Sequence, residues 1–333
     1  MAIRQLGRQE VRDRTRLPAI EAEGLVKRFG DFTAVDDVGF EVPRGTVLGL
    51  LGPNGAGKTT IVRMMTTLSA PTSGRARVAG YDVASEPDMV RRSMGLTGQA
   101  ASVDEILTGR ENIRMIGGLH GIGRRELARR GDELLEHFSL ADAADRQVKT
   151  YSGGMRRRLD LAVSLLATPP VLFLDEPTTG LDPRSRAEMW AVIRDLVAQG
   201  TTLLLTTQYL EEADHLADDI VVIDKGRVIA QGTPLQLKNQ AGAASLVITV
   251  TDPDDLGSAE ALLGKTGSEV FVDRAARRLT MPAGGLEDLT RVVDWLRNSR
   301  IAVDDIGLSR PSLDDVFLSL TGHFADDSPE ESR

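Results

Sequence analysis

The chain has 333 residues, enough for two domains, and it contains no cysteine, which excludes a disulfide framework and a thiolate metal site. It has no run of 18 or more apolar residues and no apolar stretch after its arginine-rich start, so we expect neither a membrane-spanning helix nor a secretory signal, and a cytoplasmic location. Most of the net charge of −9 lies in residues 241–333, with 17 acidic and 9 basic side chains, so no nucleic-acid partner is expected.

Residues 1–18 are polar, rich in arginine and end at Pro18, so we expect a mobile N-terminal extension. It is either a solvated tail or an arm that meets a lipid surface. From Ile20 onward, short apolar runs of strand length alternate with longer helical stretches. Those runs occupy residues 47–51, 171–174, 203–205 and 220–223. The pattern predicts an α/β domain over residues 19–238, with a mostly parallel sheet covered by helices.

Between the first two of these runs the chain is richer in helix formers than in strand formers. Residues 127–138 and 155–166 have apolar side chains at helical spacing. We therefore expect a helical subdomain, at about residues 98–168, inserted into the sheet domain.

A second, smaller domain is expected over residues 245–321, after a polar linker near residues 239–244. The expected order is strand 245–250, helix 258–263, strands 270–272 and 278–281, helix 286–297 and strand 301–308. Strand, helix, strand, strand, helix, strand is the split arrangement of a ferredoxin-like α+β domain. We expect residues 322–333 to be a disordered tail.

One phosphate-loop motif, G-x-x-x-x-G-K-[ST], lies between the strand expected at residues 47–51 and a helix expected to begin near Lys58. Its glycines let backbone N–H groups face phosphates, Lys58 reaches the outer phosphates, and the Thr59 hydroxyl can hold Mg²⁺. A lysine at a helix start is unfavourable without a nearby anion, which argues against a simple glycine-rich turn. The predicted nucleotide-binding residues are Gly52, Pro53, Asn54, Gly55, Ala56, Gly57, Lys58, Thr59 and Thr60.

Two acids, Asp175 and Glu176, end the second apolar run just before Pro177. The proline stops the strand, so both carboxylates should lie at the carboxyl edge of the parallel sheet, where ligands bind. Asp175 suits a metal ligand, directly or through water, and Glu176 suits a general base that deprotonates the attacking water. Two acids after a strand also fit a solvated loop, but the phosphate loop favours the functional interpretation.

Ser152, Gly153 and Gly154 precede an apolar helix, and the serine hydroxyl and exposed amides form an anion site much like that of the phosphate loop. Three arginines at positions 156–158 crowd the first turns, where the helix dipole disfavours cations. We therefore expect an anion beside them, either a nucleotide or a carboxylate of the protein surface.

The order of these motifs over residues 20–232 resembles that of ABC transporter ATP-binding subunits. The resemblance is carried by the phosphate loop, Gln99, the signature Tyr151-Ser152-Gly153-Gly154-Met155, the pair Asp175-Glu176, and Gly180-Leu181-Asp182. It implies a P-loop ABC ATPase fold that binds ATP and Mg²⁺, with Gln99 and Asp182 near the nucleotide and Gln99 also a metal ligand. It further implies that Phe29 stacks on adenine, although a core aromatic is the alternative.

In this family two subunits close head to tail, so the resemblance implies a second copy of the chain as partner. Each ATP would lie between one subunit's phosphate loop and the other's Ser152, Gly153 and Gly154. Gln99 and residues 104–112 would carry the nucleotide state to a membrane partner. Residues 151–158, 206–213 and 310–317 resemble the daunorubicin/doxorubicin-resistance type of exporter ATPase most closely. That type implies an integral-membrane permease partner, a place on the cytoplasmic membrane face, and export of a drug, lipid or secondary metabolite.

Gln208 departs from the family pattern, because most ABC ATPases have a histidine after this strand. A glutamine amide can hydrogen-bond a γ-phosphate, but it cannot hold or release a proton near pH 7 as imidazole can. A mechanism in which this residue carries the proton is therefore excluded. The predicted catalytic residues are Glu176 as the base, together with Lys58 and Gln208.

The predicted function is the ATP-hydrolysing subunit of an exporter. One alternative is a soluble regulatory or nucleic-acid-associated ABC ATPase without a permease. Such proteins commonly carry two motors or long coiled-coil insertions, whereas this sequence has one phosphate loop and no such insertion. A second alternative is an importer ATPase whose C-terminal domain senses a ligand, although that domain contains no pocket motif.

Overall fold

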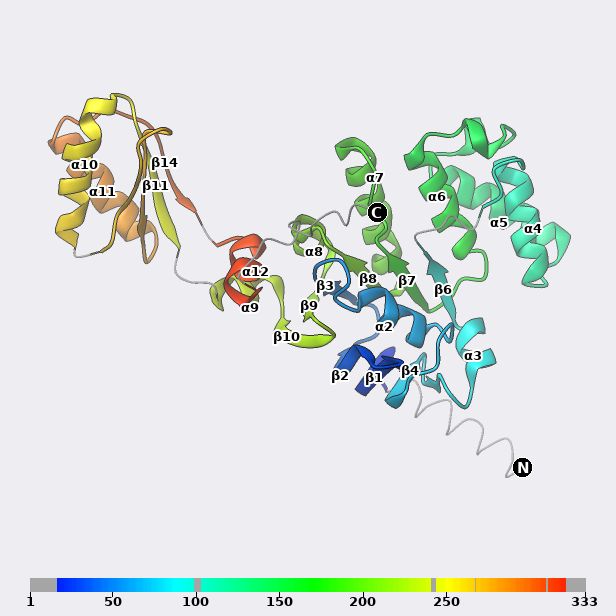
Figure 1. Cartoon of the computed structure of the whole chain (residues 1–333). Coiled ribbons are helices and arrows are strands. Elements are labelled where there is room, and N and C mark those ends of the chain that lie inside the picture. The colour runs from blue at the N-terminus through cyan, green and yellow to red at the C-terminus, as the bar shows by residue number, and fades with distance from the viewer. Residues whose placement is uncertain (1–16, 99–102, 241–243, 267, 310, 322–333) are drawn as a thin grey trace, which may run out of the picture. The chain divides into compact units, whose positions relative to one another are not determined.

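The computed structural model describes residues 17–98, 103–240, 244–266, 268–309 and 311–321. Apart from Leu17 and Pro18, the predicted N-terminal extension lies outside these residues, as does the predicted tail. The described chain forms two compact units, which meet in sequence between Pro234 and Leu235 (Figure 1). The domain limits inferred from the sequence remain predictions. Within the described residues, no helix combines the length and the apolar character needed to cross a membrane.

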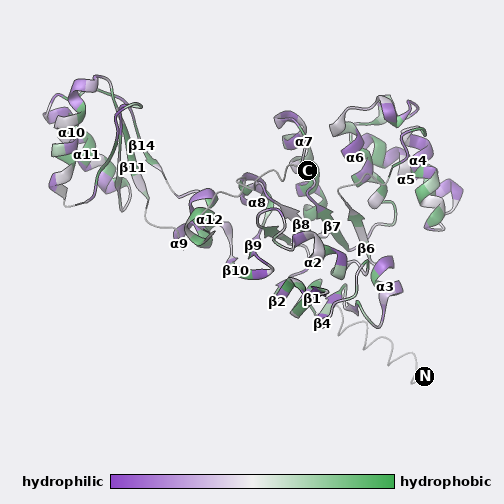
Figure 2. Ribbon diagram, viewed as in Figure 1, coloured by the Kyte–Doolittle hydropathy of each residue, from purple (hydrophilic) through white to green (hydrophobic). Residues whose placement is uncertain are grey.

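The first unit is built on a six-stranded sheet in the order β10-β9-β3-β8-β7-β6. Neighbouring strands from β9 to β6 are parallel, and β10 runs antiparallel to β9. Both faces are covered, so β3 and β7 are buried over their whole length, and Figure 2 shows β7 and β8 as hydrophobic. The predicted, mostly parallel sheet is confirmed. Its strands are β3 (Val47–Leu51), β6 (Met94–Thr97), β7 (Val171–Asp175), β8 (Thr202–Thr207), β9 (Asp219–Asp224) and β10 (Arg227–Gly232).

A second, antiparallel sheet of the same unit, in the order β2-β1-β4-β5, was not expected from the sequence. Its buried side chains share one core with helix α2 and the central sheet, and Leu25, Ile61 and Phe173 represent the three layers. Its strands are β1 (Ile20–Phe29), β2 (Phe32–Val42), β4 (Ser73–Val78) and β5 (Tyr81–Asp82), and the helices beside it are α2 (Lys58–Met65) and α3 (Pro87–Arg92).

The segment between β6 and β7 is helical, as the sequence predicts, and its buried residues form a core with α7 and one face of the central sheet. A capping box at Thr108 begins its first helix, α4, and Ser152 caps its last helix, α6. The helices are α4 (Gly109–Leu119), α5 (Arg124–His137) and α6 (Gly153–Ser164), with short 3-10 turns at Ala141–Ala143 and Val148–Thr150; α7 (Pro183–Ala198) and α8 (Leu210–Leu216) follow β7 and β8.

The second unit contains an antiparallel sheet in the order β12-β13-β11-β14. With the first strand in the middle beside the third and fourth, this is the predicted ferredoxin-like arrangement, which the structure confirms. Helices α10 and α11 cover one face of this sheet, and a core that includes Ile248, Leu263 and Leu296 lies between them. The elements are α9 (Pro234–Gln240), β11 (Ser245–Val250), α10 (Leu256–Leu263), β12 (Phe271–Asp273), β13 (Arg278–Pro282), α11 (Leu286–Asn298), β14 (Val303–Ser309) and α12 (Leu313–Thr321), with 3-10 turns at Pro253–Asp255 and Gly264–Thr266.

Candidate active site

The carboxyl ends of three parallel strands bring the sequence motifs together. The phosphate loop follows β3, Glu176 follows β7, and Gln208 follows β8. In the register of the sheet Leu51 lies opposite Thr207, and Asp175 lies opposite Thr206. Motifs that are more than 100 residues apart in sequence therefore share one edge of the central sheet.

The phosphate loop fits closely against its own chain, and two of its glycines are required by that fit. A Cβ atom on Gly52 would lie 2.2 Å from the carbonyl oxygen of Ile223, and one on Gly57 would lie 2.6 Å from that of Ala34. Gly57 also has a φ of 109°, which favours glycine, and it is the N-cap of α2. The loop thus leads directly into the N-terminus of α2, and a glycine-rich loop at a helix start is a general anion-binding arrangement.

Lys58 is buried at this helix start. Its Nζ atom donates to the carbonyl oxygens of Gly52, at 2.6 Å, and Pro53, at 3.0 Å. Burial lowers the pKa of Lys58 below its ordinary value, although Glu176 and then Asp175 act in the opposite direction. A buried ammonium group held by carbonyl oxygens gains from an anion beside it, so Lys58 is placed to bind phosphate.

Asp175 and Thr59 are close enough to share a cation. The Thr59 hydroxyl donates to Oδ1 of Asp175 at 3.3 Å, and the Thr206 hydroxyl donates to the same oxygen at 2.5 Å. The described residues hold no group of three or more His, Cys, Asp or Glu side chains that would form a complete metal site. A carboxylate and a hydroxyl, completed by phosphates and water, fit Mg²⁺, which rarely uses an all-protein cage.

Glu176 has an unusual backbone conformation for a residue other than glycine, with a φ of 51°. Its amide donates to the carbonyl oxygen and to the hydroxyl oxygen of Thr206, both at 3.1 Å. The Thr179 hydroxyl donates to Oε2 at 3.2 Å, which helps to orient the carboxylate. Glu176 lines two cavities, one at the phosphate loop and one at Gly153.

The cavity at the phosphate loop has a volume of about 360 Å³. Phe29 lines it and is 54% exposed, so the alternative of a core aromatic is wrong. Phe32, 65% exposed, lines it as well, because Phe29 and Phe32 pair across the turn between β1 and β2. Phe32 is not among the residues predicted from the sequence, although the Gly30-Asp31 turn between two phenylalanines is a hairpin signal that identifies it. The remaining lining residues are Ala34, Asn54, Gly55, Ala56, Gly57, Lys58, Thr59, Thr60 and Glu176.

The signature segment lies at the start of α6. The Ser152 hydroxyl oxygen accepts a hydrogen bond from the amide of Met155 at 3.2 Å. A Cβ atom on Gly153 would meet nothing within 4 Å, so this side of the helix start is open. On Gly154, in contrast, a Cβ atom would lie 2.7 Å from the Ser185 hydroxyl oxygen, so the start of α7 abuts that of α6.

Each of the three arginines after the signature has partners within its own chain. Arg156 pairs with Glu105 at 2.9 Å, and Arg158 pairs with Glu188 at 3.4 Å. Arg157 donates to backbone carbonyl groups and lies 3.7 Å from Asp160. The sequence left two possible anions beside these arginines, a nucleotide or a carboxylate of the protein. In the structure, carboxylates of the same chain lie beside them.

Two further predicted residues lie at the same edge. Asp182 caps α7, where Oδ1 accepts from the Ser185 amide at 3.0 Å and Oδ2 from its hydroxyl at 2.7 Å. The hydrogen bond from the Ser185 amide holds the pKa of Asp182 below its ordinary value. Gln208 follows Thr207 directly and is half-buried. Gln99 lies outside the described residues, and its predicted contacts with nucleotide and metal remain predictions.

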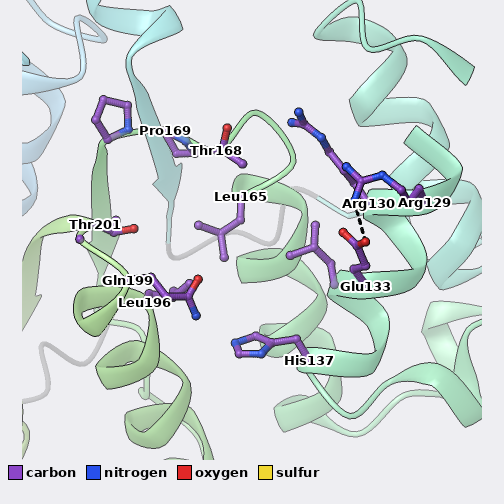
Figure 3. Close-up of a pocket in the computed structure, with 13 residues that line it drawn as sticks. Arg129, Arg130, Glu133, His137, Leu165, Thr168, Pro169, Leu196, Gln199 and Thr201 are labelled. Carbon is purple, nitrogen blue, oxygen red and sulfur yellow. Dashed lines mark hydrogen bonds and ion pairs between the residues drawn. The ribbon is translucent and has the colours of Figure 1, made fainter. Parts of the chain in front are cut away.

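A larger cavity, of about 660 Å³, lies at the opposite ends of β7 and β8, where Pro170 and Thr201 precede the strands (Figure 3). Two arginines line it, but Arg129 pairs with Glu126 and Glu133, and Arg130 pairs with Glu126. Their charges are thus already neutralised within the chain. None of the phosphate-loop residues lines this cavity, so size does not identify the active site.

At the smaller cavity, an anion-binding loop, a buried ammonium group and a carboxylate suited to act as a base face the same space. Backbone amides and a lysine bind the phosphates of a nucleoside triphosphate, and a carboxylate activates the water that cleaves it. The fold and the site therefore define a P-loop nucleotide hydrolase.

Comparison with known proteins identifies the family. Residues 35–179 match the ABC transporter family. The chain is 54% identical over 305 residues to the daunorubicin resistance ATP-binding protein DrrA3 of Streptomyces coeruleorubidus, covering 91% of this chain and 96% of that protein. It is 39% identical over 306 residues to the Nod factor export ATP-binding protein I of Ralstonia nicotianae, covering 92% of this chain and 94% of that protein. The chain therefore belongs to the ABC transporter ATP-binding proteins, and it is an ATPase that binds ATP.

A solved ATP-binding subunit of an ABC transporter has the same fold. It aligns with a TM-score of 0.61 and 30% identity, covering 67% of this chain and 92% of that chain. This agreement confirms the P-loop ABC ATPase fold that the sequence motifs predict.

Proposed function

We propose that the chain powers export through a separate integral-membrane permease, as a dimer of two copies at the cytoplasmic face of the membrane. The observation that carries the proposal is the position of Glu176, which lines both the phosphate-loop cavity and the cavity at the open signature glycine. The relatives named for daunorubicin resistance and Nod factor export support the direction of transport. The proposed cargo is accordingly a drug, lipid or secondary metabolite.

In the proposed mechanism, the backbone N–H groups of residues 54–60 and the Lys58 ammonium group bind the phosphates, and Phe29 and Phe32 contact the adenine ring. Asp175 and Thr59 would hold Mg²⁺, which when bound would neutralise charge on the phosphate oxygens. Glu176 accepts the proton of the attacking water, and the Gln208 amide donates to the γ-phosphate. Ser152, Gly153 and Gly154 contact the nucleotide of the opposing subunit, with Asp182 fixing the neighbouring start of α7.

Purification from membranes of the native host tests this function. We expect the chain to copurify with a permease and to show ATPase activity that rises when a transported ligand is added. The Glu176→Gln variant is the matched control, because it should keep the permease and lose the activity. A monomer with no membrane partner would contradict the exporter proposal and favour the soluble ATPase. Cargo-stimulated uptake by the same complex would instead favour the importer.

A further inference from the structure

Arg157 contacts four backbone carbonyl oxygens with one side chain. Nε donates to Pro177 at 2.9 Å, and Nη1 donates to Gly98 at 2.5 Å. Nη2 donates both to Asp175, at 3.0 Å, and to Glu176, at 3.1 Å. Only 13% of the side chain is exposed. One buried guanidinium group therefore joins the signature helix α6 to the ends of β6 and β7.

The contacts lie where the central sheet stops. Pairing of β6 with β7 ends at Thr97 and Leu174, and pairing of β7 with β8 ends at Asp175 and Thr206. Carbonyl groups beyond this point lose the regular sheet partners, and a buried carbonyl group without a donor is costly. Arg157 provides donors there in place of a neighbouring strand.

Glu176 is held from two sides by these interactions. Its amide donates to Thr206 of β8, whereas its carbonyl oxygen accepts from Arg157 of α6 at 3.1 Å and, at the longer distance of 3.4 Å, from the Thr179 amide. Its φ of 51° is rarely adopted by residues other than glycine, so the surroundings must maintain it. This backbone conformation sets the direction of the Cα–Cβ bond from which the carboxylate extends.

We propose that Arg157 is a positioning residue for ATP hydrolysis, which couples the position of α6 to the backbone of Glu176. The inference rests on the proposed function of Glu176 as the base. Ser152 caps the helix that carries Arg157, so a shift of α6 when Ser152 meets the opposing nucleotide reaches Glu176 through Arg157. Lysine cannot reproduce this link, because its single nitrogen lacks the planar, five-donor geometry of a guanidinium group.

Steady-state kinetics of the full chain with Arg157→Lys tests the proposal. We expect kcat to fall about tenfold or more, while KM for ATP and the nucleotide Kd stay within about twofold of native values. Arg130→Lys is the matched control, because Arg130 also donates to a carbonyl group, that of Leu166 at 3.0 Å, at the other cavity. An unchanged kcat in Arg157→Lys would overturn the proposal. So would parallel losses of kcat, affinity and thermal midpoint, which indicate a merely structural role.

A double variant separates this inference from the function on which it rests. In the Glu176→Gln background, Arg157→Lys should reduce the residual rate by less than about twofold, because the group that it positions is already gone. A second full tenfold loss would show that Arg157 acts elsewhere and would overturn the proposal. Near-native turnover of Glu176→Gln alone would instead overturn the assignment of the base. If Arg157→Lys does not fold, Arg157→Gln is measured by the same criteria.

Discussion

Two glycine-rich helix starts lie in the first unit, and they differ in what surrounds them. At the phosphate loop, backbone oxygens of Ile223 and Ala34 leave no room for a Cβ atom on Gly52 or Gly57. At the signature, nothing lies within 4 Å of a Cβ atom built on Gly153. The partial positive charge of the helix is similar at both places, but the phosphate loop is packed against its own chain at Gly52 and Gly57, whereas the signature is packed only at Gly154.

Because of this difference, the phosphate loop forms a complete anion site, whereas the start of α6 forms one side of such a site. The phosphate loop has walls, a buried lysine and two nearby acids, so it can hold a nucleotide within one chain. The start of α6 has one exposed face, and its arginines are already paired within the chain. Under the proposed function, the second surface that encloses a ligand there would come from the opposing subunit of the head-to-tail dimer.

The largest expected effect comes from Glu176→Gln, which keeps both helix starts and removes only the proposed base. We expect turnover to fall about 10²-fold or more, and an ATP-bound dimer to accumulate because closure occurs without hydrolysis. Phosphate release and the ATP-dependent molar mass in solution measure the two effects. Glu133→Gln, at the other cavity, is the control and should behave as native. Near-normal phosphate release by Glu176→Gln would refute the assignment.

A carboxylate introduced on the open side of the signature tests whether the phosphate loop and the signature have different roles in nucleotide binding. Gly153→Asp should leave nucleotide binding to the monomer unchanged but lower ATPase activity about tenfold or more, because the new charge meets phosphates only in the dimer. Lys58→Ala should instead lose nucleotide binding itself. Isothermal calorimetry and ATPase assays distinguish the two, with Gly118→Asp as a control at another open glycine. An equal loss of nucleotide binding to the monomer in Gly153→Asp and Lys58→Ala would contradict this difference between the signature and the phosphate loop.

Gln208 tests whether the enclosed site senses the γ-phosphate. If its amide donates to that phosphate, Gln208→Ala should lose about tenfold in ATPase activity, as expected for a lost hydrogen bond to a charged group. Gln208→His, which keeps a donor, should stay within about threefold of native activity. Activity of the alanine variant equal to that of the native protein would make Gln208 part of the scaffold.

The parts of this site that the sequence predicted are local, and the parts it missed depend on contacts between distant segments. The phosphate loop and the acids after β7 follow from their own residues, since each motif is continuous and adjoins an apolar strand. The sheet of β1, β2, β4 and β5 was missed because β1 and β2 contain no continuous run of buried residues, whereas the prediction of strands relied on continuous apolar runs. The partners of Arg156 and Arg158 could not be predicted either, because Glu105 and Glu188 come from other helices and loops.

Glu212 links α8 to α7, and its substitution has the smallest expected effect. It is fully buried in α8, where Oε1 accepts a hydrogen bond from Nε1 of Trp190 in α7 at 3.2 Å. Burial raises the pKa of Glu212 above its ordinary value. The folded state therefore binds this proton more tightly than the unfolded state, so stability falls as pH rises from about 4.5 through the folded-state pKa.

Glu212→Gln removes this titration but keeps an acceptor for Trp190. We expect its thermal midpoint to approach that of the native protein near pH 4.5 and to exceed it at pH 8, by about 2–4 °C for each kcal/mol gained. Scanning calorimetry across that range measures the difference, and Glu211→Gln, an exposed neighbour on the same helix, should give a curve parallel to the native one. Parallel curves for Glu212→Gln and native protein would mean that Glu212 does not titrate on unfolding. Protonation of the Glu212 carboxyl group would then make no contribution to the packing of α7 against α8.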